Sequence, residues 1–237
     1  MNKWLERLQF SLFPGMCILC GVNTGRRIDL CQSCEEDLPT IQHPCWQCGL
    51  NVPPHQELCG QCLTRPPPFS HCYTAFRYAA PIDMLINRFK NQSQLVTGKV
   101  LSVVLAKNYL EDHLLVPDIW LPVPLHKDRL KTRGFNQAFE IATFLSDHTQ
   151  RPIQSRLCRR IKQTTDQKKL NAIERATNIK QAFVLDGRLN GESIGIVDDV
   201  ITTTATVSEL ARILLKHGAG DIQVVALART PADSKKH

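Results

Sequence analysis

The chain has 237 residues, of which 43% are hydrophobic, and a formal net charge of +7. This length allows one large domain or two modest ones, and the apolar content is sufficient for a folded core. No apolar run approaches the ~20 residues that cross a bilayer, so a helical membrane-spanning protein is excluded. Residues 1–13 carry Glu6 and Arg7 inside an apolar pattern, which argues against a signal peptide and favours a short amphipathic helix. We therefore expect a cytoplasmic protein without membrane insertion.

Eight of the ten cysteines form four Cys-x-x-Cys pairs. In a protein without an export signal, such pairs indicate zinc ligands rather than disulfides. Thioredoxin-like redox pairs are disfavoured because no βαβ pattern lies nearby. The remaining cysteines, Cys72 and Cys158, need no special role because buried cysteine behaves as a small apolar residue. The pairs are Cys17/Cys20, Cys31/Cys34, Cys45/Cys48 and Cys59/Cys62.

The cysteine-rich segment contains a 28-residue repeat, because residues 17–23 (CILCGVN) match residues 45–51 (CWQCGLN). A duplicated unit should contain a complete metal site, and closed sites with four cysteines are structural. A cross-braced arrangement, in which the first pair shares a metal with the third, is the alternative. Because each unit of the repeat should contain a complete site, we assign one zinc to Cys17, Cys20, Cys31 and Cys34 and a second to Cys45, Cys48, Cys59 and Cys62.

Zinc binding changes the charge balance of the chain. A zinc ion with four thiolates carries a charge of −2, so two such sites lower the formal +7 to about +3. Basic residues concentrate between positions 126 and 180, where thirteen Lys or Arg stand against five Asp or Glu. A basic face of this kind attracts polyanions, either a diphosphate sugar or a nucleic-acid backbone. The sequence does not separate these two ligands.

A proline run at 65–68 ends the cysteine-rich segment and stiffens the chain that follows it. We therefore expect one domain over 1–71 and a second over 72–237. Alternating or continuous apolar patterns predict the elements of the second domain. These are a strand over 72–78, helices over 81–90 and 94–112, a strand over 118–124, a helix ending at 147 and a last strand over 221–229.

A basic segment follows the strand over 118–124. Arg129 and Arg133 are four residues apart, hence on one side if this segment is helical, and would fork onto pyrophosphate oxygens. Gly134 would let the backbone approach a ligand. Asn136 and Gln137 would either hydrogen-bond the ligand or cap the next helix. The alternative is a solvated basic turn.

The most informative segment is 193–207. Its apolar run predicts a buried strand that stops at two adjacent acids, Asp198 and Asp199. A hydroxyl-rich loop at 202–206 and a helical pattern closed by Gly218 follow. This order places the loop at the C-terminal edge of a sheet, where α/β proteins bind ligands and a helix N-terminus favours an anion. Carboxylates beside such a loop suit a sugar phosphate. The alternatives are acids that merely cap the next helix, or a Walker-B-like pair, which the lack of a Gly-x-x-x-x-Gly-Lys-Ser/Thr motif disfavours.

Residues 197–206, Val-Asp-Asp-Val-Ile-Thr-Thr-Thr-Ala-Thr, resemble the diphosphate-ribose loop of type I phosphoribosyltransferases. The resemblance implies that Asp198 and Asp199 hold the ribose hydroxyls and that the loop holds the 5-phosphate. Thr204 replaces the family's usual glycine, which adopts backbone conformations that cost other residues ~1 kcal/mol or more. Thr204 therefore either bears that strain or holds the loop in another shape, with its hydroxyl capping the helix. The loop residues are Thr202, Thr203, Thr204, Ala205 and Thr206.

Three further blocks resemble the ComF family, which joins a cysteine-rich module to a phosphoribosyltransferase-like domain. Residues 123–137 follow its Val-Pro-Leu-His-x-x-Arg-x-x-x-Arg-Gly-Phe-Asn-Gln element nearly residue for residue. Residues 85–91 resemble its Leu-Lys-Phe-x-Gly element with an altered order, so the role of Lys90 stays unassigned. The family fold implied is a parallel-sheet α/β domain of type I phosphoribosyltransferase kind, preceded by a small cysteine-rich double zinc-ribbon module.

The third block, 160–183, also follows the ComF pattern. In phosphoribosyltransferases a mobile loop in this part of the chain closes over the diphosphate and excludes water. The polar run 162–169 suits such a loop, and 170–179 suits a helix. The block's loop residues are Arg160, Thr164, Gln167 and Arg175.

The chain is thus identified as a member of the ComF family, similar to its GntX-like members. Membership implies a role in DNA uptake, natural competence or use of DNA. It also implies that the ligand is phosphoribosyl pyrophosphate (PRPP) with magnesium, and that the phosphoribosyl group is transferred to an acceptor. No general base is evident in the sequence, so the acceptor is not identified. The alternative is a non-catalytic protein that senses PRPP, or binds single-stranded DNA or a competence helicase.

Overall fold

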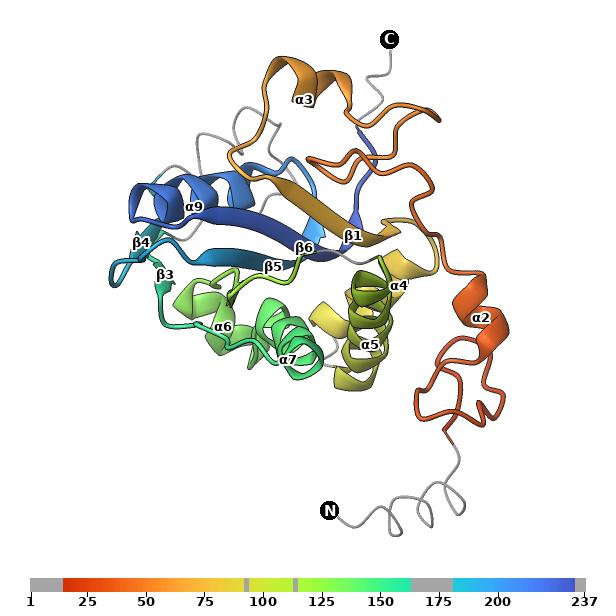
Figure 1. The fold of residues 1–237 in the computed structure, drawn as a ribbon. Coiled ribbons are helices and arrows are strands. Elements are labelled where there is room, and N and C mark those ends of the chain that lie inside the picture. Colours follow the sequence, from red (N-terminus) through yellow and green to blue (C-terminus); the bar gives the residue numbers. More distant parts are fainter. Residues whose placement is uncertain (1–14, 92–93, 113–114, 163–180, 233–237) are drawn as a thin grey trace.

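The computed structural model describes residues 15–91, 94–112, 115–162 and 181–232. The helix expected over 1–13 and the loop and helix expected over 163–179 lie outside these residues. A four-stranded parallel sheet forms the centre of the described part, in the order β1-β6-β5-β2 (Figure 1). Its strands are β1 (His71–Arg77), β2 (Ile119–Pro122), β5 (Ser193–Ile201) and β6 (Asp221–Arg229).

Helices cover both faces of this sheet. Three of them, α4 (Ile82–Asn91), α5 (Leu95–Glu111) and α7 (Gln137–Thr149), lie on one face (Figure 1). The helix α9 (Ala205–Lys216) lies on the other face. A parallel sheet buried on both faces by helices is the α/β architecture that the phosphoribosyltransferase-like prediction requires. The predicted fold class is confirmed.

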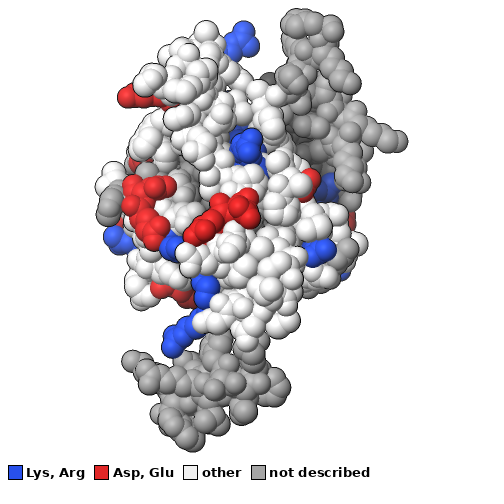
Figure 2. Space-filling model, turned by 90° about the vertical axis from the view of Figure 1, so that its right-hand side faces the viewer, with Lys and Arg blue, Asp and Glu red and all other residues white. Residues whose placement is uncertain are grey.

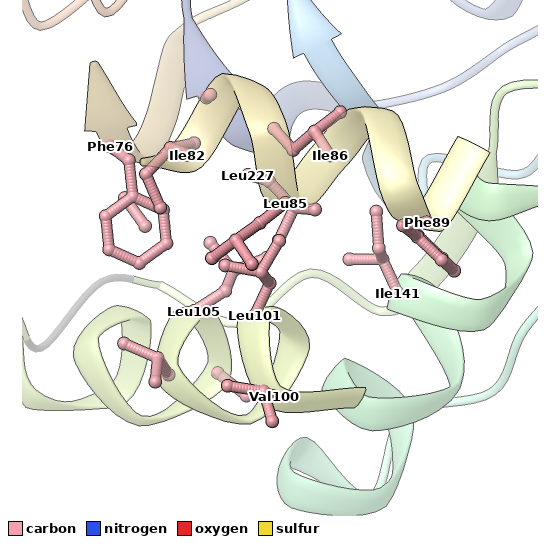
Figure 3. Packing of buried hydrophobic residues seen from close by; sticks show 14 of the residues in the cluster. Phe76, Ile82, Leu85, Ile86, Phe89, Val100, Leu101, Leu105, Ile141 and Leu227 are labelled. Atoms are coloured by element: carbon pink, nitrogen blue, oxygen red, sulfur yellow. The ribbon is translucent and has the colours of Figure 1, made fainter. Parts of the chain in front are cut away.

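The strands supply a core on each face of the sheet because they are apolar along nearly their whole length. Val197 of β5 and Val225 and Leu227 of β6 are buried together with α4 and α5. Ile196 and Val224, their neighbours in the strands, are buried with α9 instead. Successive strand residues point to opposite faces, so one continuous apolar run fills both cores. Figure 3 shows the first core, in which side chains of α4, α5 and α7 pack together.

Strand β5 continues past Asp198 and Asp199 to Ile201. Val200 and Ile201 are still in parallel register with the last residues of β6. The prediction that the strand stops at the acids is therefore wrong. The apolar run ends there, but the partner strand extends as far and provides backbone hydrogen bonds for the additional residues.

One glycine of β5, Gly195, is paired with Trp120 of β2. A Cβ atom on Gly195 would lie 2.5 Å from the indole ring of Trp120. The indole is fully buried, and its Nε1 donates a hydrogen bond to Thr149 Oγ1 at 2.9 Å. A glycine in a strand interior often marks such a close approach, and here it makes room for the largest buried side chain.

The cysteine-rich module covers the outer edge of β1. The N–H of Arg77 donates to the carbonyl of Pro39 at 2.7 Å, and the N–H of Cys72 donates to the carbonyl of Trp46 at 3.1 Å. An uncovered edge strand would present unpaired backbone groups. The module therefore packs against the sheet, and the division into domains at residue 71 stays a prediction.

The remaining elements of the described residues are short. They are α2 (Gln32–Glu36) and α3 (Gly60–Thr64) in the cysteine-rich module, α6 (Lys127–Arg133), and the antiparallel pair β3 (Cys158–Arg160) and β4 (Phe183–Leu185). Within the part of the chain that the structure describes, no helix has the length and apolar character needed to span a membrane.

Candidate functional site

The eight paired cysteines form two separate clusters. Within each cluster the four sulfur atoms all lie within 4.8 Å of one another. Four thiols at this separation fit one tetrahedral zinc ion, and a site in which the protein supplies all four ligands is typical of structural zinc. The sequential pairing is confirmed and the cross-braced alternative is wrong. The clusters are Cys17, Cys20, Cys31 and Cys34, and Cys45, Cys48, Cys59 and Cys62.

The 28-residue repeat extends to the backbone of the two sites. The N–H of Cys17 donates to the carbonyl of Val22 at 2.8 Å, and the N–H of Cys45 donates to the carbonyl of Leu50 at 2.6 Å. Each turn is flanked by one isolated antiparallel bridge. The same chain geometry therefore presents the first cysteine pair of each site.

A cavity of about 280 Å³ opens at the C-terminal ends of β2 and β5. Parallel α/β sheets bind ligands at this edge. The cavity brings together the acidic pair, the hydroxyl-rich loop and the basic segment, which are far apart in the sequence. Its ionisable lining residues include Lys90, Arg129, Arg133, Arg160, Asp198 and Asp199.

The two acids in the cavity have different partners. Asp199 Oδ2 lies 2.8 Å from Lys90 Nζ, at the end of α4. Asp198 Oδ1 accepts a hydrogen bond from the N–H of Asp199 at 2.9 Å. Burial, followed by the charge of Asp199, raises the pKa of Asp198 to about 7, whereas Lys90 opposes the shift. Asp198 is therefore partly protonated at neutral pH, and a bound cation would favour its ionised form.

The loop between β5 and α9 has one residue in the left-handed region, Thr204, with φ 59° and ψ −5°. This is the position where the resembled motif has glycine. The Thr204 hydroxyl donates to the carbonyl of Thr203 at 2.6 Å and makes no capping hydrogen bond to α9. The capping alternative is therefore wrong, and the threonine adopts the backbone conformation that glycine favours. A small hollow of about 20 Å³ lies at this loop, lined by Asp198 and residues 200–207.

Helix α6 places the two predicted arginines at the cavity. Arg129 and Arg133 lie one turn apart on this helix, and both line the cavity. His126 Nδ1 caps the helix start by accepting a hydrogen bond from the N–H of Asp128 at 3.4 Å. Gly134 ends the helix with φ 80°, the usual glycine cap, so helix termination accounts for this glycine without a ligand.

The sequence left ligand binding and helix capping open for Asn136 and Gln137. Asn136 caps α7, because its Oδ1 accepts from the N–H of Ala138 and its Nδ2 donates to the carbonyl of Val123, both at 3.1 Å. Gln137 Oε1 accepts from Arg133 at 3.0 Å. The buried Gln137 Nε2 has no hydrogen-bond partner within the described residues. Both side chains line the cavity, and of these two residues Gln137 keeps an unused donor.

Arg160, the last residue of β3, also lines the cavity. Burial, followed by the positive charge of Arg129, lowers the pKa of Arg160, whereas Asp198 opposes the shift. The other predicted loop residues, Thr164, Gln167 and Arg175, lie outside the described residues. Their placement at the cavity stays a prediction.

Sequence reasoning missed Tyr78 and Thr230 and left Lys90 unassigned, although all three line the cavity. Tyr78 and Thr230 each directly follow a strand, β1 and β6 respectively. Residues that follow parallel strands lie at the same edge of a sheet, so their position was a usable signal. Lys90 comes from the last turn of α4, and the sequence does not indicate where that helix end is directed.

Charged side chains are mixed in sign on the face shown in Figure 2. Acidic and basic groups are interspersed there, and the described residues of this face form no continuous basic surface. Four cations, by contrast, line one cavity. These four cations exceed the two acids of the same cavity, Asp198 and Asp199, and a local excess of positive charge at a concave site favours small or thin polyanions.

Comparison with known proteins identifies the family. Residues 8–63 match the family model described as the double zinc ribbon domain. Over 232 residues the chain is 32% identical to the DNA utilization protein YhgH of Salmonella typhimurium, covering 96% of both chains. Over 159 residues it is 36% identical to competence protein F of Haemophilus influenzae, covering 64% of this chain and 69% of that relative. The chain belongs to the competence protein F (ComF) family. The likeness of this ComF-family chain to GntX-like members stays a prediction.

Solved structures overlap the ComF-family chain in part. A purine phosphoribosyltransferase from Pyrococcus horikoshii aligns with 20% identity and a TM-score of 0.32, covering 54% of this chain and 70% of that structure. The AQ2163 protein of Aquifex aeolicus aligns with 12% identity and a TM-score of 0.37, covering 70% and 91% respectively. At these TM-scores the likeness carries no conclusion about ligand or reaction.

Proposed function

We propose that this ComF-family protein binds PRPP, or a related ribose 5-phosphate ligand, in the cavity at the ends of β2 and β5. The proposal depends on one observation: a carboxylate pair, Thr202 and Thr206 of the loop before α9, and two arginines of α6 converge on this cavity. A ligand with vicinal hydroxyls, a 5-phosphate and a diphosphate has one group for each of them. The printed names of the relatives, DNA utilization protein and competence protein F, support a role in DNA uptake, competence or use of DNA.

Each part of the ligand has a proposed partner. Asp198 and Asp199 would accept hydrogen bonds from the ribose hydroxyls, and the loop at 202–206 would hold the 5-phosphate through backbone N–H groups at the start of α9. The diphosphate, as its magnesium complex, would lie near Arg129 and Arg133, since guanidinium groups bind such oxygens in pairs. The unused Gln137 Nε2 next to Arg133 would be a further donor.

The same arrangement would support phosphoribosyl transfer. As a nucleophile forms a bond to the ribose C1, the bond to pyrophosphate breaks, and negative charge develops on the departing group. Arg129 and Arg133 would stabilise this charge because they are already oriented by the helix. The acceptor is not assigned, because the described lining contains no histidine and its two acids are used for the ribose.

A second candidate function is binding of single-stranded DNA, or of a competence helicase, without transfer. The observation that favours it is the local charge of +8 over residues 126–180, because thin polyanions are attracted to a basic groove. Affinity for single-stranded DNA that falls steeply with salt, and that weakens in an Arg129→Met/Arg133→Met variant, would support it.

Titration calorimetry with PRPP and magnesium tests the first proposal. We expect binding by the wild-type protein and a loss of at least about tenfold in affinity for Asp198→Asn/Asp199→Asn, which removes both carboxylates. Asp186→Asn is the matched control, because Asp186 forms an exposed pair with Arg159 outside the cavity. If the wild-type protein binds neither PRPP nor ribose 5-phosphate, the proposal is wrong. Binding without pyrophosphate release across many acceptors would favour a sensor over an enzyme.

A further inference from the structure

Arg229, the last residue of β6, lies between the second zinc ribbon and the proposed sugar-phosphate loop. Its side chain is buried, with 5% of its surface exposed. Its Nε donates to the carbonyl of Cys48 at 2.9 Å, and its Nη1 donates to the carbonyl of Ile201 at 3.0 Å and to that of Thr202. One buried guanidinium thus joins a zinc-ligand residue to the first residue of the loop.

Arg229 is closely packed both on the side of β5 and on the side of the second zinc ribbon. Arg229 is in parallel register with Ile201, the last residue of β5. On the ribbon side, Gly49 follows Cys48 with φ 69°, and a Cβ atom there would lie 2.9 Å from Thr74 Oγ1 of β1. The ribbon turn is therefore packed directly against the sheet, and small displacements of Cys48 would be transmitted to Arg229.

The energetic cost of burying the positive charge of Arg229 depends on its neighbours. Within the described residues, its guanidinium takes part in no ion pair and donates to carbonyl oxygens and one hydroxyl. A buried cation without a carboxylate partner is costly. The second cluster carries a charge of about −2 when zinc is bound to its four thiolates. A metal-loaded ribbon would therefore offset the positive charge of Arg229.

We propose that Arg229 is a positioning residue through which the second zinc ribbon holds the start of the sugar-phosphate loop. Zinc fixes the backbone at Cys48, Cys48 orients Arg229, and Arg229 holds the carbonyls of Ile201 and Thr202. These contacts fix the direction in which the loop leaves β5. The consequence for ligand affinity rests on the proposed function, whereas the consequence for the loop does not.

Hydrogen exchange of the full-length, ligand-free protein tests the coupling without any ligand. Cys59→Ser impairs the second site, and Cys31→Ser impairs the first site at the equivalent position of the repeat. We expect the amides of Ser208 and Thr230, which donate to the loop-side carbonyls of Thr204 and Ile201, to exchange about tenfold faster in Cys59→Ser, as for the loss of one or two hydrogen bonds. Exchange of these amides should stay unchanged in Cys31→Ser. Faster loop exchange in both variants would overturn the proposal, because the coupling is specific to the second ribbon.

Substitution of Arg229 avoids disturbing a metal site. Arg229→Met should retain two zinc ions per chain, measured by metal analysis, and still exchange at the loop as fast as Cys59→Ser. Arg229→Lys, which keeps the charge and some of the donors, should restore part of the protection. Wild-type loop exchange in Arg229→Met would overturn the proposal, and so would uniformly faster exchange across β5 and β6, which a purely structural role predicts.

Ligand affinity separates this proposal from the proposed function. If the wild-type protein binds ribose 5-phosphate, we expect about tenfold weaker binding by Arg229→Met, in parallel with its faster loop exchange. If the wild-type protein binds no ribose 5-phosphate but the loop responds to Arg229→Met, the proposed function fails and the coupling stands. Unchanged ribose 5-phosphate affinity with a mobile loop would show that Arg229 does not position the ligand site.

Discussion

Lys90 Nζ and Asp199 Oδ2 lie 2.8 Å apart and join the end of α4 to β5. The two side chains are 24% and 13% exposed, so the pair is only partly screened by water. The ammonium group offsets the repulsion between Asp199 and its neighbour Asp198. Two adjacent carboxylates can therefore occupy one concave site, and the pKa of Asp198 depends on a helix that the sugar-phosphate motif does not include.

Replacing Lys90 tests this dependence. Lys90 lowers the pKa of Asp198 against the effects of burial and of Asp199, so Lys90→Met should raise that pKa above its wild-type value of about 7. Carboxyl NMR titration measures the change directly. Lys99→Met is the control, since Lys99 is an exposed residue of α5 away from the cavity. An unchanged Asp198 pKa in Lys90→Met would show that the ion pair does not act on the acidic pair.

The raised pKa of Asp198 makes stability depend on pH. The folded protein holds this proton up to about pH 7, whereas the unfolded chain releases it near the ordinary aspartate pKa of 3.8. The contribution of Asp198 to stability is therefore complete below about pH 4 and is lost as the pH rises to about 7. Relative to Asp198→Asn, the wild-type free energy of unfolding should fall by up to about 1.4 kcal/mol per pH unit in this window. Denaturant titrations at several pH values measure it, and parallel pH profiles would contradict the raised pKa.

Thr204→Gly should stabilise the protein by up to about 1 kcal/mol, because the left-handed backbone at φ 59° is strained for a threonine and relaxed for glycine. The same substitution should tighten binding of a 5-phosphate, although modestly, since the loop already has the glycine-type shape. Denaturant melts and calorimetry with ribose 5-phosphate measure the two effects. Thr203→Gly is the control and should destabilise, because Thr203 has no positive φ. A less stable Thr204→Gly protein would mean that the threonine side chain contributes more than the strain it causes.

The arginines of α6 should contribute to the binding of the diphosphate and not to the binding of the rest of the ligand. Arg133→Met should weaken PRPP binding about tenfold and leave ribose 5-phosphate binding nearly unchanged, because only PRPP has the diphosphate. Arg159→Met is the control, since Arg159 pairs with Asp186 and does not line the cavity. Equal losses for both ligands would place Arg133 at the 5-phosphate or make it structural.

Gly195→Ala should destabilise the fold by about 1–3 kcal/mol, because the added methyl group would lie 2.5 Å from Trp120. A second substitution separates the clash from any effect on the strand. In a Trp120→Leu background the alanine should cost less, because the ring is gone and only the contact with Pro117 Cγ, 2.7 Å from the added methyl group, is left. Additive losses in the double variant, measured by denaturant unfolding, would show that the clash is not the cause.

The sequence by itself determined the order of helices, strands and loops along the chain. Apolar runs and helical spacing predicted the strands and helices, and the resemblance to the ComF family implied their parallel α/β arrangement. The 28-residue cysteine repeat predicted two sequential zinc sites, and the strand–loop–helix order placed the acids and the loop at the edge of the sheet. These features depend on residues near one another in the chain or on a repeat that can be read directly. They are therefore available before any folding is considered.

The tertiary structure alone decided which distant side chains meet. The extension of β5 to Ile201 depends on β6, the approach of Lys90 to Asp199 depends on the packing of α4, and the contacts of Arg229 link residues 48, 201 and 229. The sequence likewise did not determine the backbone angle of Thr204, because a residue adopts a strained conformation only when the surrounding structure imposes it. Local patterns specify elements, but the energies of buried charges and strained turns are set by neighbours that the chain brings together only when it folds.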